Sequence, residues 1–452
     1  MKAKQQFITK LVLLTSLAIQ SYRVGAQHPS VYSLDECIAV ALNNNELLQN
    51  SLLDMESSEF KVKEVKSALL PTIDLNSQYT YYTQLPPQYV PAKSFGGQEG
   101  EFNKLTMGLP QTTNINVQVR QVLFNQSLLT DLKAAKVYQE ASHLKLKLTK
   151  DDIVYSVATT YYSIQVLEDN LSRVKENIMN LEKTASINES LKSNDLIAEN
   201  IHNRLLINLE NLKNQYENQR LVKQKNITLL KYLMNLSGDE VITVTRFDYE
   251  SPIESPDFAD INDRYDIKLQ QVNIRIAEFD KKRAQAGYYP TLQMGFNYGF
   301  MGYDHEFAPG QAINGDWINS SALSLSLNIP LFDGLGKHYK IRQRDIAVQK
   351  NQNSLSLMRM SAARELQDAV DNYSSSANQF SNSKKSLDLA EHLFMSSQSE
   401  FESGITSTTD LLNAQNDLTN ARTNYSTALL NLKLAELSWK KASGKLSQEF
   451  NN

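Results

Sequence analysis

The side chains that most often carry catalysis are scattered along this chain. Its six histidines follow no regular spacing: they are His28, His143, His202, His305, His338 and His392. They form neither an HExxH motif nor a Cys/His set, and Cys37 is the only cysteine. Gly334-Leu335-Gly336 follows a predicted strand, but no third glycine completes a dinucleotide-binding fingerprint, so it predicts a turn. We therefore expect no enzyme activity, no cofactor and no metal site.

The N-terminus is typical of a secretory signal peptide. Lysines at positions 2, 4 and 10 form a basic region, and residues 11–19 are a short apolar run. Residues 24–26 are small enough to precede a cleavage site, so we expect residues 1–26 to be removed. A membrane-spanning helix needs about 20 apolar residues, and no other segment of the sequence is a candidate for one.

Composition favours long helices and gives no reason to expect nucleic acid binding. The chain has 452 residues and a formal net charge of −4. Its glycines and prolines are few and clustered, which indicates long helices with few breaks. An exported chain without a membrane-spanning helix is either periplasmic, secreted or part of an outer-membrane β-barrel.

Alternating segments are the strongest structural pattern in the chain. After Pro290, residues 291–301 place Leu292, Met294, Phe296, Tyr298 and Phe300 on one face of a strand, with small or polar residues on the other. Such a strand fits a barrel wall between lipid and water. Similar alternation predicts strands at about 72–82, 114–124 and 322–332. The loop between the first two, residues 85–111, is rich in glycine and proline.

The chain is internally duplicated. Residues 27–236 and 264–444 each predict helix, strand, loop, strand, long helix, break and helix, and residues 237–263 form a linker with some β-prone sequence. Residues 445–452 form a polar tail. The fold class predicted is mainly α with a transmembrane β-barrel, built from two helix-strand-strand-helix repeats.

The predicted helices are too long for an ordinary globular protein. Two of them cover about 127–190 and 334–402, and the first helix of the chain covers 33–70. The last helix, 408–443, carries a large residue and an alanine every seven positions, as in a coiled-coil seam. The large residues are Leu411, Leu418, Tyr425, Leu432 and Trp439, and the small ones are Ala414, Ala421, Ala428, Ala435 and Ala442.

Four strands cannot close a barrel, because about eight is the smallest number known to do so. Open strand edges are not tolerated in hydrocarbon, so several chains must share one barrel. Two copies would supply eight strands around a filled interior, and three would supply twelve around a wet lumen. The polar strand faces favour three. Where strands meet helices, we expect an interfacial girdle of aromatics, the alternative being ordinary core positions; these residues are Phe124, Tyr288, Tyr289 and Phe332.

With these patterns in place, the sequence resembles the TolC-like family of outer-membrane efflux channels over nearly all of its mature length. The specific motifs are SLDECIAVALNNN, SALLPTIDL, AGYYPTLQM, IPLFDG and FESGITSTTDLLNAQNDL. The resemblance implies a homotrimer in the cell outer membrane, with a twelve-stranded barrel continued by a long α-helical barrel into the periplasm of a Gram-negative bacterium. It also implies a periplasmic adaptor (membrane fusion) protein and an inner-membrane efflux pump or ABC transporter as partners.

The resemblance also implies a periplasmic gate near the last helix break. Asp410 resembles the first of two gate aspartates in the family, and Asn413 stands at the second position. Phe401 and Thr406 occupy positions where some members carry a tyrosine and an arginine that latch the closed gate. Asp410 also has capping-box spacing from Ser407, so it is equally expected to start the helix, and the two roles are compatible.

Two helix breaks are predicted to be hairpin tips that meet the adaptor, the alternative being plain surface turns. The tip residues are Leu191, Ser193, Asp195, Gly404 and Thr406. The leading function is a passive duct for small toxic molecules such as drugs, dyes and metals. One alternative is a conduit for type I protein secretion, and another is a periplasmic coiled-coil scaffold with no pore.

Overall fold

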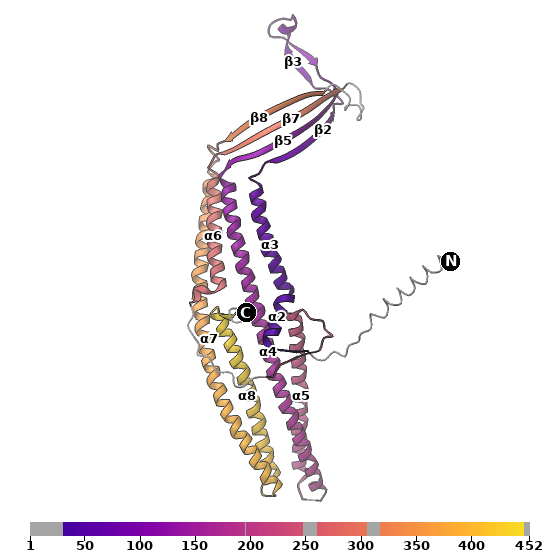
Figure 1. The fold of residues 1–452 in the computed structure, drawn as a ribbon, viewed down its shortest axis with the longest axis vertical. Helices are drawn as coiled ribbons and strands as arrows, with labels where there is room; N and C mark the ends of the chain where they lie inside the picture. Colours follow the sequence, from indigo (N-terminus) through magenta and orange to yellow (C-terminus); the bar gives the residue numbers. More distant parts are fainter. Residues whose placement is uncertain (1–29, 195, 247–259, 305–316, 447–452) are drawn as a thin grey trace, which may run out of the picture. The chain divides into compact units, whose positions relative to one another are not determined.

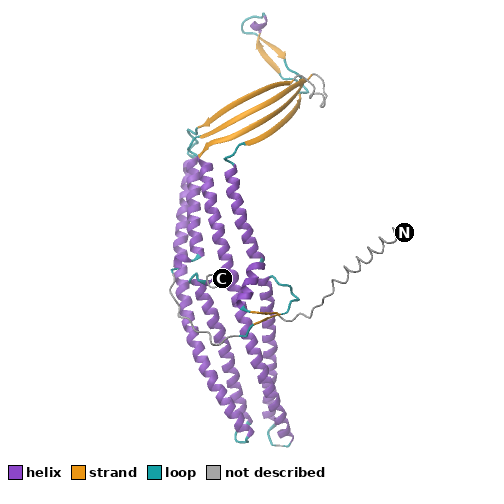
Figure 2. Ribbon diagram, in the orientation of Figure 1, coloured by secondary structure: helices purple, strands orange, loops and turns teal. Residues whose placement is uncertain are grey.

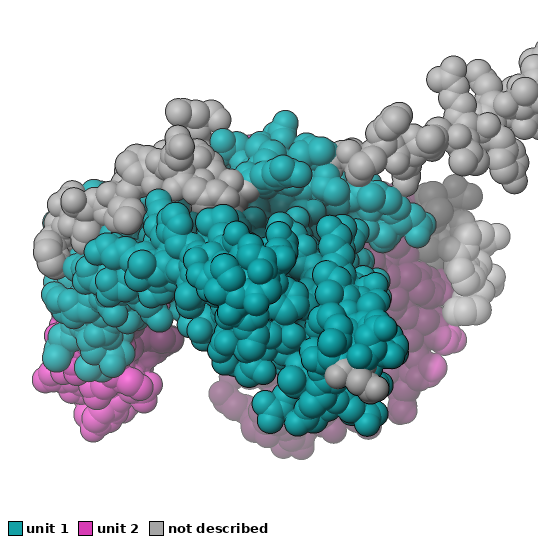
Figure 3. Space-filling model, turned by 90° about the horizontal axis from the view of Figure 1, so that it is seen from below, with its two compact units in different colours: residues 1–53, 144–268, 357–452 teal, residues 54–143, 269–356 magenta. Residues whose placement is uncertain are grey.

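The computed structural model describes residues 30–194, 196–246, 260–304 and 317–446, so the predicted signal peptide lies outside the described residues. The chain divides into two compact units, shown in different colours in Figure 3. Unit 1 comprises residues 1–53, 144–268 and 357–452, and unit 2 comprises residues 54–143 and 269–356.

Unit 2 contains a four-stranded antiparallel sheet, drawn in orange in Figure 2. Its strands, in spatial order, are β2 (Thr72–Tyr81), β5 (Gln111–Asn125), β7 (Thr291–Asp304) and β8 (Trp317–Asn328). The two strands from the first half of the sequence therefore lie beside the two from the second half, in chain order, with β2 and β8 at the edges of the sheet.

The register places like residues in rows across the sheet. One row of the apolar face is Ile73, Val119, Phe296 and Leu323. The next row, on the polar face, is Asp74, Gln118, Asn297 and Ala322. Each strand alternates in phase with its neighbours, so the sheet has one apolar side and one polar side.

Three strands have boundaries that differ from the predicted ones. β5 begins at Gln111 rather than 114, and β7 continues to Asp304. β8 covers 317–328 rather than 322–332. It stops before Pro330, because proline lacks the N–H that a ladder position requires.

The segment predicted as a loop, 85–111, contains a hairpin, which corrects the sequence-based expectation. β3 (Pro87–Pro91) pairs antiparallel with β4 (Phe102–Thr106), and η1 (Ala92–Phe95) lies between them. Prolines occupy both ends of β3. β3 has a single neighbour in this two-stranded sheet, so an absent N–H can face away from the ladder, and proline therefore does not forbid a strand here.

The seven described α-helices are labelled in Figure 1. They are α2 (Leu34–Asn44), α3 (Glu46–Ser67), α4 (Gln126–Ser193), α5 (Glu199–Met234), α6 (Tyr265–Ala286), α7 (Gly336–Glu402) and α8 (Thr408–Ala442). Among the described helices, none has a stretch both long and apolar enough to cross a membrane. In unit 1, β1 (Ser30–Tyr32) pairs parallel with β6 (Ile242–Val244), which lies in the β-prone part of the predicted linker.

The first predicted helix is interrupted at Asn45, where we expected an unbroken helix over 33–70. The backbone of Asn45 is extended, and its Oδ1 accepts a hydrogen bond from the Leu47 amide at 2.9 Å. Its Nδ2 donates to the Leu233 carbonyl at 2.8 Å, near the end of α5. Asn45 thus satisfies polar groups at the start of α3 and the end of α5.

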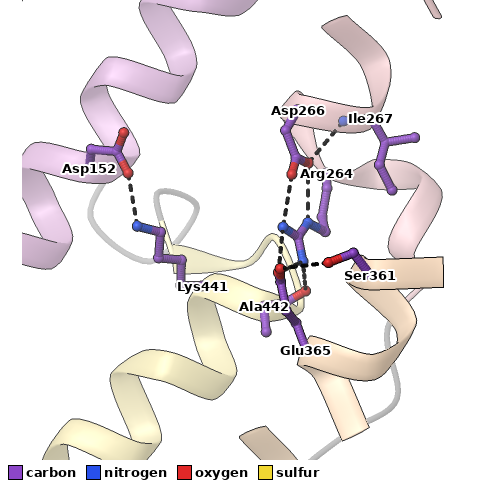
Figure 4. A network of polar contacts seen from close by, with 8 residues as sticks. All are labelled: Asp152, Arg264, Asp266, Ile267, Ser361, Glu365, Lys441 and Ala442. Carbon is purple, nitrogen blue, oxygen red and sulfur yellow. Dashed lines mark hydrogen bonds and ion pairs between the residues drawn. The ribbon is translucent and has the colours of Figure 1, made fainter. Parts of the chain in front are cut away.

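Arg264 plays the corresponding part in the second half of the chain (Figure 4). Its guanidinium donates to Asp266 Oδ2 at 2.8 Å, to Glu365 Oε2 at 3.0 Å, and to the Ala442 carbonyl at 3.5 Å. The end of α8 therefore meets the start of α6, as the end of α5 meets the start of α3. Gly444 has a φ of +70° and lies against Arg264, where a Cβ would be 3.4 Å from its Cγ.

All ten residues of the predicted heptad seam in α8 are buried. They contact α7 in three successive clusters along the helix. Trp439 clusters with Leu366 and Val370, and Leu432 clusters with Tyr373. Leu418 and Tyr425 cluster with Leu387 and Ala390. The two helices therefore pack as an antiparallel pair along the length of α8.

Candidate functional site: the hairpin tips

The turn between α7 and α8 is a Schellman motif. The Gly404 amide donates to the Phe401 carbonyl at 2.9 Å, and the Ile405 amide donates to the Glu400 carbonyl at 2.8 Å. Gly404 has a φ of +72°, the left-handed conformation that this motif requires of the first residue after the helix cap. Glycine at this position thus sets the end of the long helix and the direction of the chain into α8.

Ser407 caps the start of α8 and holds the carboxylate of Asp410. The Ser407 hydroxyl accepts a hydrogen bond from the Asp410 amide at 3.2 Å and lies 2.6 Å from Asp410 Oδ2, to which it donates. Thr406 Oγ1 is 3.4 Å from the same oxygen. The hydrogen bond from Ser407 lowers the pKa of Asp410, which keeps its exposed side chain ionised. Ser407 therefore caps α8, and the Asp410 side chain takes part in the helix start by accepting a hydrogen bond from the Ser407 hydroxyl.

Asp410 and Asn413 lie on an exposed polar stripe of α8, separate from the buried seam. The stripe continues at alternating intervals of three and four residues; its members are Asp410, Asn413, Asp417, Asn420, Asn424, Thr427 and Asn431, all of them exposed. Asp417 was missed in the sequence, although its heptad offset from Asp410 would have found it. Seven helical residues separate the two carboxylates by about 10 Å along the axis.

Phe401 does not belong to this stripe. It lines a pocket of about 210 Å³ together with Ile187 of α4 and with Leu411 and Gln415 of α8. Thr406 remains beside Asp410. Of the four residues predicted for the gate, the structure brings Asp410, Asn413 and Thr406 to the start of α8 and places Phe401 among the helices.

The turn between α4 and α5 is closed by the Leu196 amide, which donates to the Leu191 carbonyl at 2.9 Å. Ser193 is exposed here, and Asp195 lies outside the described residues. Each tip carries an aliphatic side chain that the prediction did not include, Leu196 at 68% exposure and Ile405 at 78%. Single exposed apolar side chains are common on protein surfaces, so this exposure alone does not mark a contact surface.

The two hairpins are joined by apolar and polar contacts. Leu412 of α8 packs against Leu181 of α4 and Leu205 of α5. Farther from the tips, Arg422 of α8 donates to Asn177 Oδ1 of α4 at 2.9 Å and to Glu391 Oε1 of α7 at 3.4 Å. The tips therefore extend from helices that are held together above them.

The predicted girdle aromatics all have exposed side chains in unit 2, at the ends of strands or helices; they are Phe124, Tyr288, Tyr289 and Phe332. The apolar face of the sheet is also exposed, to 70% at Ile73 and 73% at Leu323. No cluster of three His, Cys, Asp or Glu residues able to hold a metal ion occurs within the described residues.

Comparison with known proteins finds similarity to outer-membrane efflux and export proteins. Residues 261–445 match the family model described as outer membrane efflux protein. The toxin and drug export protein A of Aggregatibacter actinomycetemcomitans is 23% identical over 296 residues. That match covers 63% of this chain and 62% of the relative, so it spans less than two thirds of either protein.

Solved structures share the fold over most of the chain. VceC of Vibrio cholerae is 16% identical with a TM-score of 0.72, covering 91% of this chain and 96% of VceC. CmeC of Campylobacter jejuni, an outer membrane channel, is 16% identical with a TM-score of 0.75, covering 92% of this chain and 88% of CmeC. The open state of the MtrE outer membrane channel of Neisseria gonorrhoeae is 17% identical with a TM-score of 0.67, covering 91% and 89%.

Proposed function

We propose that this chain, a member of the TolC-like family of outer-membrane efflux proteins, forms the outer-membrane duct of a tripartite export system. Members of this family are channels and not enzymes. The observation that carries this proposal is the sheet of unit 2. Its apolar face is exposed, and both of its edge strands lack a further neighbour within the described sheet. Such a sheet is stable in lipid only as part of a closed barrel.

Closure with copies of the same chain satisfies both edges. β2 and β8 are antiparallel, because three antiparallel pairings separate them. In a ring of copies related by rotation, β8 of one copy would therefore lie antiparallel to β2 of the next. Every strand of the ring would then have two antiparallel neighbours, as in outer-membrane barrels.

Three copies fit the polar face better than two. Eight strands leave an interior just wide enough for side chains, whereas twelve leave a wider lumen. The polar face carries amides and hydroxyls, and an ion pair on it joins Arg120 Nη2 and Asp74 Oδ2 at 2.7 Å. These groups suit a water-filled lumen. We therefore infer a homotrimer with a twelve-stranded barrel, with residues 27–236 and 264–444 as its two repeats and 237–263 as the linker.

The helices would continue this barrel as a periplasmic α-helical tunnel, with the predicted girdle aromatics at the membrane surface. At its far end we assign the gate to the exposed stripe of α8. Three copies would form one ring of carboxylates from Asp410 and a second ring from Asp417. The Asp417 ring would take the place of the carboxylate ring that is missing at Asn413. Convergent carboxylates attract cations and raise one another's pKa. In the trimer this effect would oppose the lowering of the Asp410 pKa that the Ser407 hydrogen bond causes within one chain.

The hairpin tips are the proposed contact surface for the periplasmic adaptor. Leu191, Ser193, Gly404 and Thr406 are supported by the geometry of the two turns. Leu196 and Ile405 add an exposed apolar group at each tip. Through the adaptor, the duct would receive cargo from an inner-membrane pump.

The proposed cargo is small toxic molecules. A second candidate, type I protein secretion, is favoured by the similarity to a relative whose name includes both toxin and drug export. The exposed apolar sheet face argues against a soluble scaffold, because soluble proteins rarely expose a large apolar surface to water.

Deletion of the gene followed by a drug susceptibility panel and a profile of secreted protein separates these functions. Increased drug sensitivity that a plasmid copy reverses supports efflux, and the loss of a secreted protein supports secretion. If neither changes, and the purified protein never conducts ions in a planar bilayer, the duct proposal is wrong.

A further inference from the structure

The pocket behind Phe401, here called the tip pocket, lies within unit 1 and is formed by α4, α7 and α8. Its volume is about 210 Å³. The apolar part of its lining consists of Leu181, Ile187, Phe394, Phe401, Leu411 and Leu412. Both hairpins therefore contribute to it, the first through α4 and the second through α7 and α8.

One polar group in this lining has no partner. Gln415 is 4% exposed, and its Nε2 donates no hydrogen bond in the structure. Buried side-chain donors nearly always find an acceptor, so an unused one in the wall of a cavity points to a ligand that supplies the acceptor. The lining also contains polar side chains, but none of them accepts a hydrogen bond from Gln415 Nε2 in the structure; they are Asn180, Lys183, Thr184, Gln398 and Glu402.

The size of the pocket sets the size of the ligand. An apolar cavity of about 150 Å³ is large enough to bind benzene. The tip pocket is larger, and half of its lining residues are Leu, Ile and Phe, the other half being polar or charged. It also has a free hydrogen-bond donor, Gln415 Nε2, which would favour a ligand that carries an acceptor atom on or next to its aromatic ring.

We propose that the tip pocket binds a small aromatic molecule that carries a carbonyl or ether oxygen, which accepts a hydrogen bond from Gln415 Nε2. The ring contacts Phe394 and Phe401 on α7 and Ile187 on α4. The ligand thus bridges the two hairpins near their tips. If the proposed function holds, occupancy stabilises the observed packing of α7 and α8 on α4 and lowers the current through the duct.

Binding is tested on the full-length protein in detergent by fluorine NMR. The probes are 4-fluoroacetophenone, which has an acceptor oxygen, and 1-ethyl-4-fluorobenzene, which has the same ring and none. We expect saturable binding of both to the wild type, with the ketone about tenfold tighter, since one hydrogen bond of about 1.4 kcal/mol is a factor of ten.

Three variants locate the binding. Gln415→Met should remove the preference for the ketone, and Ile187→Phe should abolish the binding of both probes by filling the pocket. Ile207→Phe on α5 is the matched control, because Ile207 is also exposed and does not line the pocket. It should bind both probes as the wild type does.

Circular dichroism melting of each variant checks folding, and Ile187→Phe keeps the test valid if Gln415→Met does not fold. Probe partition into detergent micelles would be equal in all variants. Equal behaviour of Ile187→Phe and wild type, or a ketone preference that survives Gln415→Met, overturns the proposal. Binding without any change in current would leave the site intact and count against the proposed gate alone.

Discussion

Arg422 Nη1 donates to Asn177 Oδ1 across 2.9 Å, joining α8 to α4 although the two residues are 245 positions apart. The same guanidinium donates to Glu391 on α7 at 3.4 Å, and Arg173 of α4 lies 4.0 Å from that carboxylate. The Arg422 side chain is only 14% exposed. This network is a polar connection between the two hairpins, several turns away from their tips.

Replacing Arg422 with alanine should loosen the two hairpins. The change leaves Asn177 Oδ1 without its donor and leaves Glu391 only the more distant Arg173, which costs about 1–3 kcal/mol of unfolding free energy. If the gate opens when α7 and α8 move away from α4, single-channel open probability should also rise. Denaturant unfolding and planar-bilayer recording measure the two effects.

The control for this variant is Arg220→Ala. Arg220 forms an exposed pair with Glu217 one turn away, at 2.8 Å, and such pairs contribute about 0.5 kcal/mol or less. Arg422→Ala behaving no differently from Arg220→Ala in both measurements would show that the network does not hold the hairpins.

The two proposed carboxylate rings predict how cations block the channel. Asp410→Ala and Asp417→Ala should each weaken block by a trivalent cation, and the double variant should abolish it, because the attraction depends on converging negative charge. Asn420→Ala, a neutral member of the same stripe, is the control. Unchanged block in the double variant would place both residues outside the pore.

Removing the Ser407 hydroxyl should change both helix stability and the acid response. Ser407→Ala loses the cap of α8, worth about 1 kcal/mol, and should let the pKa of Asp410 rise toward its ordinary value. A lowered pKa stabilises the folded state above the ordinary pKa, and this stabilisation is lost as pH falls through the folded value. The wild type should therefore lose more stability than Ser407→Ala between neutral pH and about pH 3.

Thermal melting over this pH range measures the difference. Ser403→Ala is the control, because Ser403 is in the same turn and its hydroxyl donates to the Ser399 carbonyl rather than to a carboxylate. Parallel melting curves of wild type and Ser407→Ala at every pH would contradict the role assigned to this hydrogen bond.

The exposed aliphatic residues at the tips should matter for the partner and not for the trimer. Leu196→Asp and Ile405→Asp should reduce export in cells, because a charge in an apolar contact must be desolvated. The trimer should be unchanged in detergent by light scattering. Val222→Asp, on the exposed surface of α5 and away from the tips, is the control. Full export in the double tip variant would remove the tips from the contact surface.

The sequence predicted best what depends on local pattern. The alternation of Leu292, Phe296 and Phe300 identified β7, because a sheet with one apolar face imposes a period of two on every strand. The long helices followed from unbroken stretches without glycine or proline. The hairpin formed by β3 and β4 was missed, because prolines that end a short edge strand look the same in sequence as prolines in a loop.

Features that depend on distant residues could not be predicted. Nothing near Arg422 reveals that it meets Asn177, because that contact requires the pairing of α8 with α4. Asn45 breaks a helical pattern that continues on both sides, and its partner at the end of α5 is distant in sequence. Asp417, in contrast, could have been found by extending the heptad from Asp410.

Pairing of β8 with β2 of the next copy tests the central claim most directly. Ile73→Cys would be combined in turn with Leu323→Cys, Leu325→Cys and Leu327→Cys, all on the apolar face. Cys37 does not interfere, because burial raises the pKa of its thiol to about 12 and keeps it unreactive. Oxidation in cell envelopes is followed by non-reducing electrophoresis. The account predicts that one combination gives a covalent trimer as its largest product and that single-cysteine proteins stay monomeric. A covalent dimer as the end product, or no cross-link in any combination, would contradict it.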